Sequence, residues 1–97
     1  MNVPIIDRSV LLRHVRAIED QYPLKILGLL PRGSAAHVTE EHAVDFLAEK
    51  KPGLSLLDLG KAEVALGDRL GRPVGIVLKS GLKGTEAQNF PALAKPL

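Results

Sequence analysis

The sequence contains no cysteine and no tryptophan, and its aromatic residues are limited to one tyrosine and two phenylalanines. The absence of cysteine excludes disulfide bridges and thiolate metal ligands. Few aromatic rings and no concentrated basic face leave little on which nucleic-acid bases could stack, so we do not expect nucleic-acid binding. Apolar runs such as residues 26–30 are far too short to cross a bilayer, so we expect no membrane partner.

The length of 97 residues suffices for a single domain, which we place over residues 1–97. Apolar residues make up 45% of the chain and charged residues 25%, which is the balance of a folded protein and not of a disordered one. The 13 basic and 11 acidic residues are spread along the sequence and leave a net charge of +2. The first residues lack the pattern of a secretory signal, so we expect a cytoplasmic protein.

Hydrophobic periodicity and turn residues divide the chain into alternating helices and strands. The pattern predicts helices over residues 7–21, 56–70 and 87–93, strands over 24–30, 42–48 and 74–78, and one or two helical turns between 35 and 41. Such an order predicts an α+β (α/β layers) fold, a small mixed β-sheet packed by helices.

The helix that begins after Ser55 carries leucines at helical spacing, so one stripe of it is expected to pack on the sheet. The stripe consists of Leu56, Leu59, Leu66 and Leu70. In the strand over 42–48, Asp45 lies on the opposite face from Val44 and Phe46, because side chains alternate along a strand.

Three short motifs carry the functional signal. They are Gly33-Ser34-Ala35-Ala36 after the first strand, Ala43-Val44-Asp45 in the second, and Gly71-Arg72-Pro73-Val74-Gly75 leading into the third. With these motifs the chain resembles the minimal nucleotidyltransferase (MNT) domains of the DNA polymerase beta superfamily, which are encoded beside a HEPN-domain partner. The resemblance implies a nucleotidyltransferase-like fold, with a nucleotide phosphate bound at Gly33 and Ser34.

The resemblance also implies a metal site, which this sequence does not complete. In active members, two aspartates of the second strand and a third on a later strand bind two magnesium ions. The matching positions here are Ala43, Asp45 and Gly75. Asp45 is thus a remnant of the catalytic set, and a lone carboxylate binds magnesium poorly because the ion loses its water reluctantly. We therefore assign no catalytic residue, no metal and no cofactor.

Plain structural roles compete with these interpretations. Asp45 can be a structural carboxylate, and Gly33 with Ser34 can form an ordinary tight turn between a strand and a helix. His37 and His42 do not suggest zinc, because they lie on different predicted elements and no cysteine joins them.

The leading hypothesis is a nucleotidyltransferase-like protein that is catalytically inactive and acts by protein binding. Its partner would be a HEPN-domain protein, with this chain as the antitoxin, or further copies of itself in a homo-oligomer. The alternative is an active metal-dependent nucleotidyltransferase that uses Mg²⁺ and an NTP, with Glu40, Glu41 or Asp68 replacing a missing carboxylate. A third reading is a degraded paralogue without a defined activity.

Overall fold

The computed structural model describes residues 7–31, 34–35, 38 and 43–97 of the chain. The elements in chain order are α1 (Arg8–Gln21), β1 (Leu24–Leu30), β2 (Val44–Lys50), α2 (Leu56–Leu70), β3 (Val74–Leu78), the 3-10 turn η1 (Lys79–Gly81), α3 (Thr85–Leu93) and β4 (Lys95–Pro96). These elements form a mixed sheet packed by helices, which confirms the predicted α+β class.

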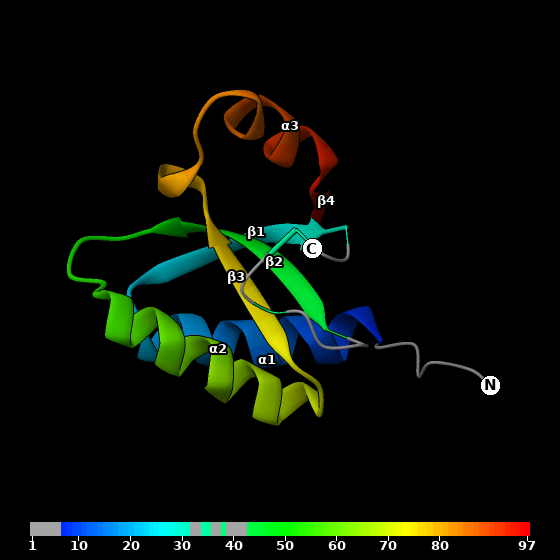
Figure 1. Ribbon diagram of the computed structural model, residues 1–97. Helices are drawn as coiled ribbons and strands as arrows, with labels where there is room; N and C mark the ends of the chain where they lie inside the picture. Colours follow the sequence, from blue (N-terminus) through cyan, green and yellow to red (C-terminus); the bar gives the residue numbers. More distant parts are fainter. Residues whose placement is uncertain (1–6, 32–33, 36–37, 39–42) are drawn as a thin grey trace.

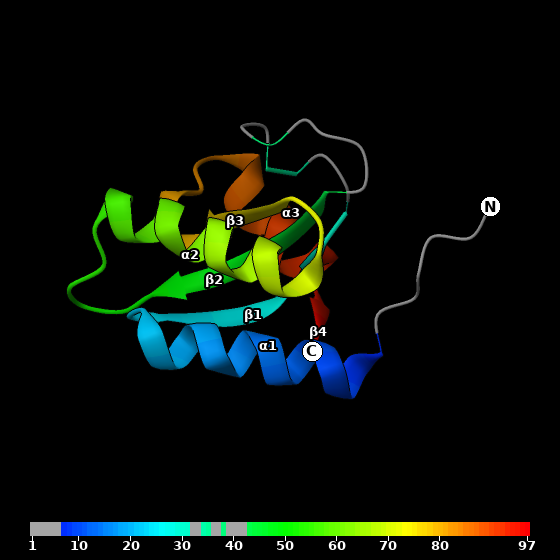
Figure 2. The same ribbon diagram turned by 90° about the horizontal axis from the view of Figure 1, so that it is seen from below.

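The four strands are ordered β3-β2-β1-β4 across the sheet. Strand β1 pairs antiparallel with β2 and with β4, whereas β2 and β3 are parallel and are connected through α2. Helices α1 and α2 cover one face of the sheet, and α3 lies on the other side (Figures 1 and 2). None of the described helices is long and apolar enough to cross a bilayer.

The hydrophobic core lies between the sheet and the layer formed by α1 and α2. Its buried residues are Leu11, Val15, Ile18, Leu24, Ile26, Phe46, Ala48, Leu54, Ala62, Leu66, Val74 and Ile76. Because side chains alternate along a strand, the β2 residues that enter this core leave Asp45 and Leu47 on the opposite face. The catalytic remnant predicted from the sequence therefore lies on the side of the sheet away from α1 and α2.

Capping residues set the ends of the two long helices. The Asp7 carboxylate accepts a hydrogen bond from the Ser9 amide at 2.8 Å, and the bonds from Ser9 hold the pKa of Asp7 below its usual value. Ser55 and Asp58 form a reciprocal capping box at the start of α2. That helix ends at Gly71, whose φ of 72° lies in the left-handed region that glycine adopts without strain.

Two helix glutamates bind backbone amides of the sheet. Glu19 of α1 accepts a hydrogen bond from the Ile26 amide at 2.8 Å, beside the register shift between Ile26 and Gly28. Glu63 of α2 accepts a hydrogen bond from the Ile76 amide at 2.7 Å, on the edge strand β3. Each carboxylate thus connects a helix to the sheet and accepts a hydrogen bond from a strand amide at a position where strand pairing is interrupted or ends.

Several boundaries differ from the sequence prediction. Strand β2 begins at Val44 and ends at Lys50, two residues later than expected at both ends, because it stays paired with β1 as far as Leu24. Leu56 is 85% exposed and not part of the core, since it occupies the first turn of α2. The expected helical turns between 35 and 41 lie largely outside the described residues.

Candidate functional site

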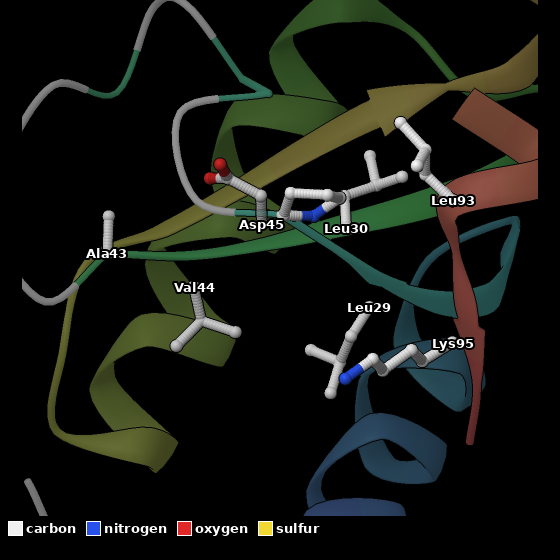
Figure 3. Close-up of a pocket in the computed structure, with 8 residues that line it drawn as sticks. Leu29, Leu30, Ala43, Val44, Asp45, Leu93 and Lys95 are labelled. Atoms are coloured by element: carbon white, nitrogen blue, oxygen red, sulfur yellow. The ribbon is translucent and has the colours of Figure 1, made fainter. Parts of the chain in front are cut away.

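Strand pairing brings two of the three predicted metal positions side by side. Asp45 of β2 is the register partner of Gly75 in the parallel β2–β3 pair. Asp45 is 1% exposed, so its carboxylate belongs to the interior of the protein and not to a strand edge open to water. The third position, Ala43, lies two residues before Asp45, and Figure 3 shows both side chains on one side of β2 with Val44 on the other.

The Asp45 carboxylate is only partly satisfied by the protein. Its Oδ2 atom accepts a hydrogen bond from the Ala35 amide at 3.3 Å. Its Oδ1 atom is buried and has no hydrogen-bond partner among the described residues. A buried polar atom without a partner costs free energy, and such atoms are found where a water or ion binds, where a group has a catalytic role or where strain is stored.

Ala35 fills the space that a side chain at position 75 would need. A Cβ atom built on Gly75 would lie 2.5 Å from the Ala35 Cβ and 2.8 Å from Asp45 Oδ1. It would also lie 3.3 Å from a methyl carbon of Val38. Ala35 is itself 1% exposed, so its methyl group is packed on the bare backbone of Gly75. An apolar group therefore occupies the space beside Gly75 into which a larger side chain would extend.

The described part of the glycine–serine turn hydrogen-bonds within itself. The Ser34 hydroxyl donates to the Pro31 carbonyl at 2.7 Å, and the Ser34 amide donates to the same carbonyl at 3.2 Å. Gly33, the other predicted phosphate-binding residue, lies outside the described residues. Phosphate binding by this turn remains a prediction, and it requires Ser34 to exchange its bonds to Pro31 for bonds to the ligand.

A pocket of about 400 Å³ opens beside this end of the sheet. It is lined by Leu29, Leu30, Pro31, Ala43, Val44, Asp45, Leu93 and Lys95. Figure 3 shows Lys95 extending beside Leu29, on the opposite side of β2 from the Asp45 carboxylate. The two charged groups point away from each other, so the lining does not converge on a phosphate or a cation.

The described residues do not fit the magnesium ions that the resemblance implies. No group of three or more histidine, cysteine, aspartate or glutamate side chains is placed to hold a metal within the described part of the chain. Asp68 lines a hollow on the outer side of α2, across the sheet from Asp45, and is too remote to complete the site. Glu40 and Glu41 lie outside the described residues.

Comparison with solved structures identifies the fold. The chain resembles a protein described as a minimal nucleotidyltransferase, with a TM-score of 0.62 and 24% identity over 98% of this chain and 100% of that one. It also resembles a chain from a crystal structure of a toxin–antitoxin with AMP-PNP, with a TM-score of 0.66 and 13% identity over 94% of this chain and 72% of that one. No family model and no curated protein matches the sequence.

The architecture is therefore that of the nucleotidyltransferase-like fold, which confirms the fold that the resemblance implied. At identities of 24% and 13%, the likeness concerns the fold, and any activity must be argued from the residues. Sequence reasoning missed Ala35 as a residue of the site. The local signal for it is a small residue directly after Gly33 and Ser34.

Proposed function

We propose that this chain is a catalytically inactive nucleotidyltransferase-like protein that acts by binding another protein. The observation that carries the proposal is the contact of Ala35 with both Asp45 and Gly75. Asp45 Oδ2 binds a backbone amide, and the methyl group of Ala35 occupies the space next to Gly75. A magnesium ion at this position would have to displace Ala35, and Asp45 would be the one carboxylate among the described residues there to bind it.

Without bound metal ions, phosphoryl transfer would lose most of its rate. Phosphoryl transfer at a two-metal site relies on the ions to neutralise charge that develops on the attacking and leaving oxygens. Loss of that stabilisation costs several kcal/mol, which corresponds to about three decades of rate or more. The interaction of Asp45 with the Ala35 amide gives the remaining carboxylate a structural role that needs no metal.

We further propose that the chain acts through a protein partner. A structural neighbour with this fold comes from a crystal structure of a toxin–antitoxin, which supports a role for the chain in a pair of that kind, and we propose the antitoxin-like role. We propose a HEPN-domain protein as the partner, because the MNT domains that the sequence resembles are encoded beside such proteins. That neighbour's crystal structure includes AMP-PNP, so nucleotide binding is the property to measure first.

Isothermal titration calorimetry of the full chain with ATP, in Mg²⁺ and in EDTA, tests the loss of the metal site. We expect no magnesium-dependent heat at millimolar ATP, and the same result for Asp45→Ala. Magnesium-dependent binding that disappears in Asp45→Ala would refute catalytic silence and would support the active transferase instead. Size-exclusion chromatography with a HEPN-domain protein encoded next to this chain tests the partner separately, and separate elution would refute the antitoxin-like role.

A further inference from the structure

Five of the seven lysines of the chain meet at one end of the sheet, although they are far apart in the sequence. This lysine end consists of Lys25, Lys50, Lys51, Lys79 and Lys83. Lys25 of β1 is the register partner of Glu49 in β2, next to Lys50. Lys79 directly follows β3 and begins η1, which contacts β2. Figures 1 and 2 show the start of β1, the end of β2 and η1 at the same end of the molecule. The candidate site at Asp45 lies near the other end of β2.

The lysine end carries charge that the protein itself does not neutralise. All five lysines are exposed, and none of them forms an ion pair within the described part of the chain. The whole chain has a net charge of only +2, so this grouping is created by the fold and not by the composition. These charges are therefore available to an oppositely charged ligand.

The charges at the lysine end alternate in sign across the three strands. Leu24 and Ile26 belong to the core, so Lys25 between them lies on the face away from α1 and α2, together with its partner Glu49. On the other side of Glu49, Lys79 follows the last residue of β3 that pairs with β2. The row Lys25–Glu49–Lys79 is thus positive, negative and positive, and it extends over about 10 Å because neighbouring strands lie about 4.8 Å apart.

Two further acids of this end, Asp20 and Asp58, do not interrupt the row. Asp20 belongs to α1 and Asp58 to α2, and both helices cover the opposite face of the sheet. Asp58 is also engaged in the capping box with Ser55. The row therefore keeps its alternating pattern on the face that a ligand would approach.

We propose that the lysine end binds an acidic surface of a protein partner, and that the row Lys25–Glu49–Lys79 selects a protein over a nucleic acid. A protein surface can present acid, base and acid side chains in turn and so match each charge of the row. A phosphate backbone presents negative charge only, and it would meet Glu49 with repulsion. This inference rests on the proposed protein binding, and it names the surface and the charge pattern through which the partner is recognised.

The exposure of these charges sets the expected affinity for a small probe. Exposed ion pairs contribute little each, so a short peptide should bind with a dissociation constant on the order of 1 mM. Binding should weaken at least fivefold between 0.1 M and 1 M salt, because the screening length falls from about 10 Å to about 3 Å.

Titration of the isotope-labelled full chain, followed through its backbone amide signals, tests the proposal. The probe is an acetylated and amidated peptide of three Glu-Lys-Glu repeats, and the comparison probe is an oligouridylate of about the same length. We expect saturable shifts of the Lys25, Glu49 and Lys79 signals with the peptide, and binding of the oligouridylate at least tenfold weaker. No saturable shift of these signals, or equal or tighter binding of the oligouridylate or of phosphatidylglycerol vesicles, would overturn the proposal.

Substitutions separate the row from charge in general. Lys25→Thr and Lys79→Glu should each weaken peptide binding at least threefold, whereas Lys95→Glu, at an exposed lysine of β4, should leave it unchanged. Both row variants should stay folded, because threonine suits a strand and Lys79 lies outside the strands, and the amide spectrum checks this. Equal weakening in Lys95→Glu would refute the assignment of the surface.

Glu49→Gln tests the selection of a protein directly. Without the negative charge in the row, affinity for the oligouridylate should rise at least threefold, while affinity for the peptide should not rise. An unchanged ratio of the two affinities would refute the selective role of the row. The titration uses no HEPN-domain protein, so its failure would refute the lysine end alone, whereas separate elution from that protein would refute the antitoxin-like role.

Discussion

Adding a single methyl group at Gly75 should destabilise this protein through a steric clash at the closed site. In Gly75→Ala, the new Cβ would lie 2.5 Å from the Ala35 Cβ and 2.8 Å from Asp45 Oδ1. Non-bonded carbon atoms rest about 3.5–4.0 Å apart, and a methyl group has no rotamer through which to escape. The segment that carries Ala35 must therefore move, and the bond from its amide to Asp45 must stretch or break.

The expected magnitudes follow from ordinary core substitutions. Overpacking costs about 1–3 kcal/mol, while replacing a strand glycine by alanine stabilises the protein by about 0.5–1 kcal/mol because the unfolded chain has less backbone freedom. Gly75→Ala should therefore lower the unfolding free energy by about 1–2 kcal/mol. Ala35→Gly loses a buried methyl group and adds backbone freedom, for a loss of about 1.5 kcal/mol. Because Ala35→Gly removes the clashing atom, the double variant should be about 1 kcal/mol more stable than the sum of the single losses predicts.

Urea unfolding of the four proteins in this cycle measures the coupling, provided that the slope of the transition is unchanged. Each kcal/mol also corresponds to a shift of about 4–8 °C in the melting temperature. Gly60→Ala is the matched control, because an added Cβ there meets no atom within 4 Å, and we expect it to be neutral or stabilising. A neutral Gly75→Ala, or losses that simply add, would show that Ala35 does not fill the site.

Three further perturbations have defined outcomes. Asp45→Asn should change the unfolding free energy by less than about 1 kcal/mol, because the amide oxygen of asparagine still accepts the hydrogen bond from Ala35. Asp45→Ala should lower the unfolding free energy by about 1–3 kcal/mol, and urea unfolding distinguishes the two variants. Glu19→Ala should cost about 1–2 kcal/mol in a thermal melt by freeing the Ile26 amide, and Glu19→Gln should cost less. The pKa of Asp7 is lower in the folded protein, so its contribution to stability is present above the usual aspartate pKa and is lost as the pH falls through the folded-state pKa. Asp7→Asn should therefore reduce the fall in unfolding free energy that the protein shows at acid pH, measured by urea unfolding at several pH values.

Local patterns in the sequence predicted most of the secondary structure. The apolar runs over 24–30 and 74–78 became β1 and β3 without change, and the helix predicted over 56–70 became α2 with the same bounds. These features depend on residues close together in the chain, so the sequence determines them directly. The two-residue strand β4 could not be predicted, because it exists only through pairing with β1.

The candidate site was predictable in part. The motifs placed Asp45 and Gly75 at matching positions, and the β2–β3 register brings them together. The contact of Ala35 with both residues joins it to two strands that come later in the chain, and no local pattern encodes such a contact. The exposure of Leu56 was missed for a related reason, since periodicity identifies an apolar stripe but not where along the helix the sheet stops covering it.

Asp45 binds the protein's own backbone at Ala35, and we propose that it does not bind a metal–nucleotide complex. Titration of the isotope-labelled chain with Mn²⁺ and ATP, followed through the backbone amide signals, tests it most directly, because paramagnetic manganese broadens signals of nearby nuclei and takes the oxygen ligands that magnesium takes. We predict that the amide signals of Ala35, Asp45 and Gly75 stay sharp and unshifted at stoichiometric metal. Selective, saturable broadening of these three signals that requires ATP would show that a metal–nucleotide complex binds beside Asp45.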